Sequence, residues 1–268
     1  MLLTALLFSI CTYSQENKCT VVNQAFDAGE QISYIVSYNW LLVWTEVGGV
    51  TFSTENAKLS GVPCLKITAR GKTFKTWDWF FKVRDEYQSW VDPLTVRPYY
   101  YKRDVDEGGF KIDITYVFNH HTNTAFSASS STKHPEIRLD TVDITPCTFD
   151  LISLTYYLRN LNMENISPSD TIHLKIMLDR ELTDITMVYR GSETIKVKDM
   201  GRFNTDRFSI ALVSGTVFKE NDWMDIWVTA DKNRIPVYIK SPVLIGAVKV
   251  RVVNMKGLKY PLTSFIEE

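Results

Sequence analysis

Residues 227–240 read Trp227-Val-Thr-Ala-Asp231-Lys-Asn233-Arg234-Ile-Pro236-Val-Tyr-Ile-Lys240, and residues 241–250 continue as Ser241-Pro242-Val-Leu-Ile-Gly246-Ala-Val-Lys-Val250. Apolar and β-branched residues flank a compact polar cluster. This pattern predicts a strand, a tight polar turn, a second strand, a bend and a long third strand. An antiparallel hairpin near the end of the chain is therefore the starting point for the rest of the fold.

The polar turn is interpreted as a structural motif of four residues. Asp231 and Asn233 favour turn geometry and tolerate a left-handed backbone. Pro236 has no backbone N–H, so it belongs at the start of a strand or on a sheet edge. Arg234 is expected to tie the turn to a neighbouring carboxylate or backbone carbonyl. The turn is thus expected to fix the register of the final strands, and Arg234 is also kept as a tentative binding residue.

Length and composition predict a well-packed β protein. The 268 residues suffice for one large β domain or two small ones, and no linker or internal repeat divides them. Apolar residues make up 45% and aromatic residues 13%, which suits strands that bury large side chains. The formal net charge is −1, so the chain has no basic excess to neutralise a phosphate backbone, and no nucleic-acid partner is expected.

The first residues predict export. Met1–Cys11 is an apolar run of signal-peptide length, too short to cross a bilayer, and small residues allow cleavage after Ser14. No Lys or Arg precedes the run, so either the true start lies upstream or the positive region is minimal. The prediction is a signal peptide at residues 1–14 and a single β-rich domain at residues 15–268, without a transmembrane segment. A lipidated Cys11 and a buried first strand or helix are the alternatives.

Three cysteines remain after this cleavage: Cys19, Cys64 and Cys147. They form no C-x-x-C pair, so neither a zinc site nor a thioredoxin-like pair is indicated. One disulfide with a buried free thiol and three buried thiols are both left open.

Alternation of apolar and polar residues marks further strands at Gly29–Tyr38 and Phe110–Phe118, and Val83–Val91 is also predicted to be a strand. A turn or bulge is expected at Gly48-Gly49. The most aromatic patch, Thr73–Phe81, is expected to be a short helix or an edge segment.

One helix is predicted, over Pro146–Met163, with Thr145 as its cap. Leucines recur on it at helical spacing and are expected to be buried. Many short strands with a single helix predict a mainly β fold. It is an antiparallel, strongly curled sheet or open barrel with one principal helix packed against it.

The sequence contains no recognisable catalytic or cofactor motif. A nucleophile elbow, a phosphate-binding loop and a dinucleotide fingerprint are all missing. His120 and His121 are adjacent and so point to opposite faces of an extended chain. Neither a metal site nor a cofactor is therefore expected.

A polar stripe runs along the predicted helix. Asp150, Ser153, Tyr157 and Asn160 recur at spacings of three and four residues. A solvent-facing strip is the plainer interpretation, and a polar seam that faces a cavity is the sharper one. Asp150, Ser153 and Tyr157 join Arg234 as tentative binding residues.

Three stretches resemble a known family. They are Phe26–Tyr34 with its Gly-Glu-x-Ile-x-Tyr pattern, Asp150–Arg159, and Val228–Pro236 followed by Ile245-Gly246. In this order they resemble an exported bacterial family catalogued as domain of unknown function 3108. The resemblance implies a predominantly β protein of a Bacteroides-type envelope, in the periplasm or at the periphery of the outer membrane. It implies no activity, so no catalytic residue is carried over.

Three functions are consistent with these observations. The leading hypothesis is a non-enzymatic envelope protein that acts in binding, assembly or transport, with an envelope partner or a small apolar or glycan ligand. A glycan hydrolase would need two carboxylates in an open cleft. A purely structural scaffold would have a filled interior. The space between sheet and helix should therefore distinguish the three.

Overall fold

The computed structural model describes residues 21–40, 43–164, 166–211, 222–243 and 246–267. The predicted signal peptide and Cys19 lie outside the described residues, so those predictions stay as they were. The division into one β-rich domain at residues 15–268 likewise stays a prediction.

Strands dominate the described part of the chain, as the sequence predicted. In chain order they are β1 (Gln31–Trp40), β2 (Val43–Leu59), β3 (Val62–Thr73), β4 (Val83–Val91), β5 (Pro98–Glu107), β6 (Phe110–Asn119), β7 (Thr124–Ser131), β8 (Arg138–Asp143), β9 (Thr148–Phe149), β10 (Thr171–Leu178), β11 (Glu181–Val197), β12 (Gly201–Ala211), β13 (Trp223–Thr229), β14 (Pro236–Pro242), β15 (Ala247–Lys256) and β16 (Phe265–Ile266). The α-helix α1 (Leu151–Leu158) and the 3₁₀ helix η1 (Lys75–Trp77) complete the described elements.

The strands form one large sheet. Its order is β8-β7-β6-β5-β4-β3-β2-β1-β15-β14-β13-β12-β11-β10-β9, with β16 beside β12. Neighbouring strands are antiparallel, apart from the short parallel pair β9–β10. The end strands β8 and β9 are not paired with each other, so the sheet is open. A mainly β, antiparallel fold with one principal helix is thus confirmed.

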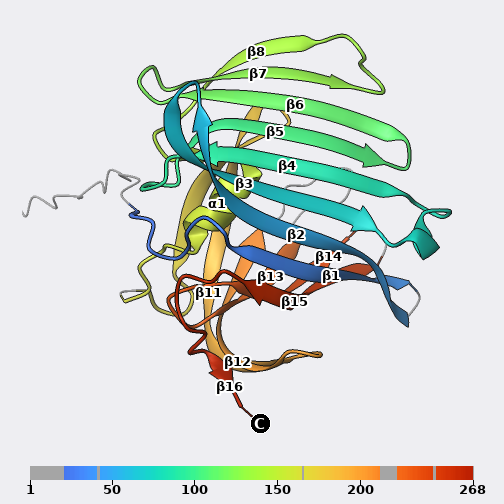
Figure 1. Cartoon of the computed structure of the whole chain (residues 1–268), viewed down its shortest axis with the longest axis vertical. Helices are drawn as coiled ribbons and strands as arrows, with labels where there is room; N and C mark the ends of the chain where they lie inside the picture. The colour runs from blue at the N-terminus through green and yellow to red at the C-terminus, as the bar shows by residue number, and fades with distance from the viewer. Residues whose placement is uncertain (1–20, 41–42, 165, 212–221, 244–245, 268) are drawn as a thin grey trace, which may run out of the picture.

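Two meanders build this sheet, β1–β8 and β10–β15, and they join where β1 pairs with β15 (Figure 1). The main core contains Ile67 and Tyr116 from the first meander, Met187 from the second and Tyr156 from α1. The same face of both meanders therefore packs around the helix. At the open side, the Arg180 guanidinium lies 2.9 Å from the Asp140 carboxylate of β8.

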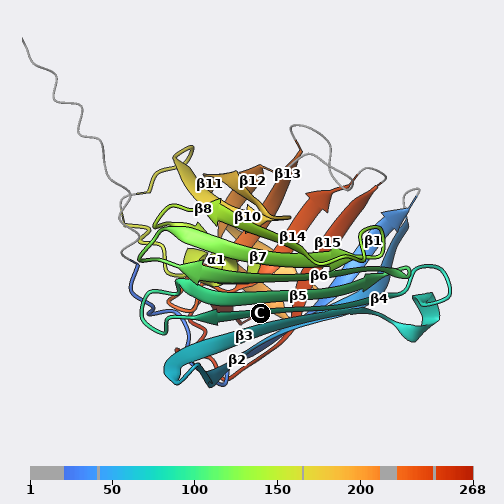
Figure 2. The same cartoon turned by 90° about the horizontal axis from the view of Figure 1, so that it is seen from above.

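The connections between strands fall at two ends of the sheet. The β1–β2, β3–β4 and β5–β6 connections lie at one end, because Gly48 pairs with Thr73 and Val83 with Glu107. This is called the β3–β4 end. The β13–β14 turn lies at the opposite end, the β2–β3 end, near the C-terminus of α1. Figure 2 shows the β3–β4 connection on the right and α1 on the left.

The predicted helix was too long at both ends. Residues 148–149 form strand β9 beside β10, so Pro146 does not begin the helix and Thr145 does not cap it. Asp150 is the N-cap, and the helix ends at Leu158. Asn160 then accepts hydrogen bonds from the backbone N–H groups of Gln24 and Ala25. Contacts with distant segments, β10 before the helix and residues 24–25 after it, thus set both ends of the helix, and a local sequence pattern does not show such contacts. No helix in the described ranges is long and apolar enough to cross a membrane.

Two cysteine states can be read from the structure. Cys64 is a buried free thiol. Cys147 is disulfide-bonded. Of the two alternatives that the sequence left open, the structure supports one disulfide with a buried free thiol.

Candidate functional site

A buried ion pair ties α1 to the rest of the molecule. The Arg159 guanidinium donates two hydrogen bonds to the Glu30 carboxylate, at 2.6 and 2.7 Å. Its Nε donates a third to the carbonyl oxygen of Asn233, at 3.0 Å. Both charged side chains are almost fully buried, 3% and 0% exposed. The guanidinium also lies over the rings of Phe26 and Tyr156.

The first turn of α1 is capped by Asp150. Its Oδ1 accepts hydrogen bonds from the N–H groups of Ile152 and Ser153, both at 2.8 Å, and the Ser153 hydroxyl accepts one from Asp150 N. The Ser89 hydroxyl of β4 donates to Asp150 Oδ2 at 2.7 Å. Burial raises the pKa of Asp150 to about 6, although these hydrogen bonds act to lower it. Asp150 and Ser153 are thus occupied in starting the helix.

The turn between β13 and β14 is held by its own side chains. Asp231 accepts from Thr229 Oγ1 and Asn233 N through one oxygen, and from Ser264 N and Oγ through the other. The buried Asn233 amide exchanges two hydrogen bonds with the backbone of Tyr260. Pro236 begins β14, where the register shifts opposite Val228. The geometry is that of a turn fastened to the C-terminal segment.

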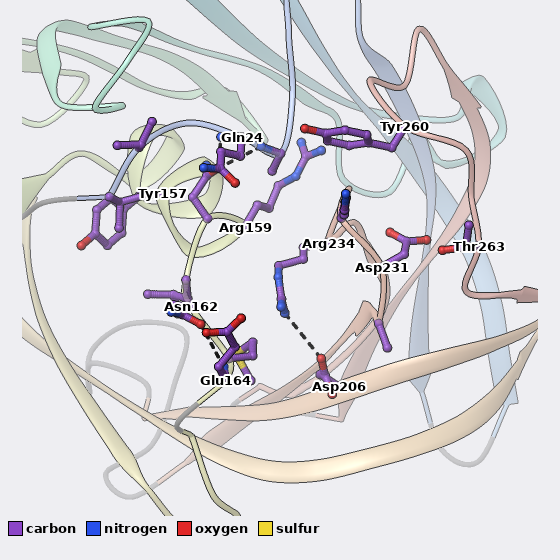
Figure 3. A pocket seen from close by; sticks show the side chains of 18 residues that line it. Gln24, Tyr157, Arg159, Asn162, Glu164, Asp206, Asp231, Arg234, Tyr260 and Thr263 are labelled. Atoms are coloured by element: carbon purple, nitrogen blue, oxygen red, sulfur yellow. Dashed lines mark hydrogen bonds and ion pairs between the residues drawn. The ribbon is translucent and has the colours of Figure 1, made fainter.

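Beside this turn lies the polar cavity, with a volume of about 1010 Å³. Tyr157, Asn160, Asp206, Asp231 and Arg234 are among the residues that line it. Figure 3 shows Arg234 reaching across it towards Asp206, and the two charged groups lie 3.5 Å apart. The other Asp206 oxygen accepts hydrogen bonds from the hydroxyls of Tyr189 and Ser192.

A second cavity of about 640 Å³, the apolar cavity, lies between α1 and strands β10–β13. Its walls are mainly aliphatic, methionine and aromatic side chains: Leu151, Leu154 and Leu158 of α1, Ile176 and Leu178 of β10, Ile185 and Met187 of β11, Phe208 and Ile210 of β12, and Met224, Ile226 and Val228 of β13. Arg159, Leu161, Met163 and Arg234 line both cavities. The interior between helix and sheet is thus not filled.

Charged residues stand where the apolar cavity meets the β3–β4 end. Arg103 of β5 lies 3.0 Å from Asp179 and beside the Tyr87 ring, and Glu107 lies at the end of the same strand. Asp85 of β4 is next to this group. Burial, reinforced by the negative charge of Glu107, raises the pKa of Asp85 to about 6.

Stability should depend on the charge of Asp85. Its folded pKa of about 6 exceeds the value of about 3.9 expected for an unfolded Asp. The contribution of the Asp85 carboxyl group to the free energy of unfolding is therefore fully present below about pH 4, and it is lost as the pH rises through about 6. We expect Asp85→Asn to stabilise the protein at about pH 7.5 by roughly 1 kcal/mol, after allowance for solvent screening. The gain should vanish near pH 4.

Urea unfolding at both pH values measures this effect. Asp104→Asn, on an exposed side chain of β5, is the matched control and should change little at either pH. A gain for Asp85→Asn that is equal at both pH values would contradict the assignment.

Among the described residues, no group of three or more His, Cys, Asp or Glu side chains is arranged to hold a metal ion. His120 instead has its Nε2 2.7 Å from the carbonyl oxygen of Pro98.

The model of a family described as "Protein of unknown function (DUF3108)" matches residues 33–253. The chain belongs to this family. None of the curated proteins matches the chain.

The fold of this DUF3108 member is similar to a solved structure. That structure is described as a beta-barrel-like protein of domain of unknown function DUF1849 from Brucella abortus. The two share 7% sequence identity with a TM-score of 0.59, over 88% of this chain and 100% of the other. At this identity the likeness concerns the fold alone.

The three stretches that resemble the DUF3108 family meet at one point. Glu30 belongs to the first stretch, Arg159 ends the second and Asn233 lies in the third, and the Arg159 guanidinium binds the other two. The residues that resemble the family thus include a buried ion pair, Glu30 with Arg159, that connects the three stretches. Sequence reasoning missed this role of Glu30 and Arg159. The available signal was that opposite charges, Glu30 and Arg159, lie in two stretches that both resemble the family.

The structure separates the tentative binding residues. Tyr157 and Arg234 come together in the polar cavity with Asn160. Asp150 and Ser153 line neither cavity and serve the helix cap. The stripe therefore divides into two parts: Asp150 and Ser153 cap the helix, and Tyr157 and Asn160 line the polar cavity. A binding role for these residues stays a prediction.

Proposed function

We propose that this protein is an exported, non-enzymatic binding or transport protein that holds an apolar ligand between α1 and the sheet. The observation that carries the proposal is the apolar cavity of about 640 Å³. Small-molecule sites have volumes of roughly 300–1,000 Å³ and mainly apolar walls. We further propose that the sheet curls strongly enough to enclose this ligand.

An unfilled interior favours a carrier over a scaffold. Protein interiors are close-packed, and empty apolar space lowers stability. A purely structural protein gains nothing from leaving this volume open. A carrier, in contrast, needs the space whenever its ligand leaves.

The polar cavity gives less support to a glycan hydrolase. Glu164, Asp206 and Asp231 line it, and the two aspartates each accept hydrogen bonds from several protein groups. Carboxylates held in this way stabilise structure. Their engagement therefore favours a binding function, and Tyr157 and Arg234 are the residues we propose for contact with a polar part of the ligand.

Export to the periplasm or the outer-membrane periphery is part of the same proposal. It is supported by the apolar run at the start of the sequence and by the disulfide at Cys147, because disulfides persist in oxidising compartments. A bacterial envelope of the Bacteroides type is proposed on the motif resemblance alone.

Binding of N-phenyl-1-naphthylamine, whose fluorescence rises in apolar sites, tests the proposal. The wild-type protein should bind the probe saturably. Met224→Trp, which places a larger side chain in the cavity wall, should raise Kd about tenfold, a loss of roughly 1.4 kcal/mol of binding free energy, because the indole ring takes up space that the probe would fill. Met255→Trp, at a partly buried methionine of the smaller core cluster, is the control and should leave Kd unchanged. No saturable binding, or equal effects of both variants, would refute the proposal.

A further inference from the structure

Large aromatic side chains are exposed at the tip of the β3–β4 connection. Trp79 is 81% exposed, Phe80 54% and Phe81 48%. The rings of Trp79 and Phe80 meet edge to face, with centroids 5.9 Å apart. Exposing three neighbouring aromatic residues is unfavourable in water, so a surface that covers them is expected.

The tip is fixed by polar contacts at its base. Arg84 donates two hydrogen bonds to the carboxylate of Asp78, at 3.1 and 2.5 Å, and Thr73 Oγ1 donates another at 2.6 Å. These contacts close the connection around η1. The hydrogen bonds to Asp78 therefore hold the connection that carries the exposed aromatic residues.

Other exposed apolar residues lie at the same end. Val43 is 66% exposed at the start of β2, and Trp44 beside it lies under the Lys249 ammonium, 3.7 Å from the ring centroid. Ile137, just before β8, is 72% exposed, and Trp223 begins β13. At the β2–β3 end, the exposed apolar residues include Val62 at the start of β3, Leu94 between β4 and β5, and Phe265 of β16.

The segment that forms the tip carries an excess of basic residues. Residues 72–84 contain Lys72, Lys75, Lys82 and Arg84 against Asp78, which is four basic residues minus one acidic residue, or +3. The whole chain has a formal net charge of −1. Asp78 is paired with Arg84, whereas Lys72, Lys75 and Lys82 are exposed. Acidic residues lie at the base of the connection: Asp85 and Glu86 follow on β4, and Asp106 and Glu107 lie opposite on β5.

The apolar cavity reaches the same end of the sheet. Glu107, Ala211 and Met224 line it, and they lie at the end of β5, the end of β12 and the start of β13. Helix α1 lies towards the opposite end, where Arg159 meets the β13–β14 turn. The rim of the cavity and the aromatic tip therefore lie at the same end of the sheet.

We propose that the β3–β4 end docks on the surface of an anionic lipid bilayer, with Trp79 and Phe80 inserted at the headgroup level. Tryptophan and other aromatic side chains favour the membrane interface, and nearby lysines are attracted by anionic headgroups. The exposed residues sit on separate connections, which suits a broad, deformable surface better than a protein groove. Docking would bring the rim of the apolar cavity to the bilayer. The class of ligand, a lipid-like hydrocarbon drawn from that bilayer, rests on the proposed function.

Sedimentation with phosphatidylcholine vesicles, with and without phosphatidylglycerol, tests the docking. The full-length wild-type protein should bind the vesicles that contain phosphatidylglycerol. The double variant Trp79→Ser with Phe80→Ser should lower the partition coefficient about tenfold or more, since it removes two large apolar side chains from the interface. The double variant Val62→Ser with Leu94→Ser, at the opposite end, is the control and should bind like wild type. Lys75→Gln with Lys82→Gln should weaken binding only to the anionic vesicles.

The outcomes separate docking from ligand binding. All these variants should bind N-phenyl-1-naphthylamine as wild type does, because none lines the apolar cavity. A wild-type protein that ignores both kinds of vesicle, or equal losses for the two serine variants, would overturn the docking proposal. Loss of probe binding in the tip variant would overturn it too. If the wild-type protein binds vesicles but not the probe, the docking proposal is supported and the proposed carrier function is refuted.

Discussion

Arg159→Met is expected to lower the free energy of unfolding by about 3–5 kcal/mol, because Glu30 is then left buried without its counter-charge. The Arg159 guanidinium makes three hydrogen bonds, two to Glu30 and one to the carbonyl oxygen of Asn233. Methionine retains part of the apolar stem but none of these donors. Urea unfolding followed by tryptophan fluorescence measures the loss.

An exposed ion pair provides the matched control. Arg70 pairs with Glu86 across β3 and β4, and the side chains are 61% and 37% exposed. Arg70→Met should cost no more than about 1 kcal/mol, since exposed pairs contribute little. A double variant, Glu30→Leu with Arg159→Met, should recover part of the loss, because no charge is then left unpaired. If Arg159→Met and Arg70→Met lower the free energy of unfolding equally, the buried ion pair does not hold the three stretches together.

Asn233→Ala is expected to have the second largest effect, a loss of roughly 2–4 kcal/mol, because it leaves buried backbone groups without partners. The Asn233 side chain donates to the carbonyl oxygen of Tyr260 at 3.1 Å and accepts from its N–H at 3.0 Å. Asn233 itself is fully buried, so water does not replace these contacts. The C-terminal segment should then detach from the β13–β14 turn.

The contrast for this prediction is Asn204 of β12, whose exposed side chain accepts one hydrogen bond from Thr194. Asn204→Ala should change stability by no more than about 0.5 kcal/mol. Thermal unfolding ranks the two variants, and limited proteolysis reports whether residues 257–267 have loosened. If Asn233→Ala behaves like Asn204→Ala, the turn is not fastened through this amide.

Local patterns in the sequence determined the strands and the fold class. The strand predicted over Val83–Val91 has the bounds of β4, and the polar cluster predicted the turn between β13 and β14. The Gly48-Gly49 prediction corresponds to a bulge, because the register shifts beside Gly48 in the β1–β2 pair. These features depend on neighbouring residues, whose spacing is visible in the chain itself.

The tertiary structure alone decided how these pieces meet. Gln31 pairs with Lys256, and Glu30 binds Arg159 across 129 residues. Asp150 became a helix cap because Ser89 and the N–H groups of Ile152 and Ser153 surround it, while Tyr157, two turns further on, reached a cavity. The physical reason is that alternation assigns a side chain to a face, but the charges, voids and partners on that face come from distant strands. The sequence therefore determined the elements, and long-range packing determined the ion pair, the two cavities and the aromatic end.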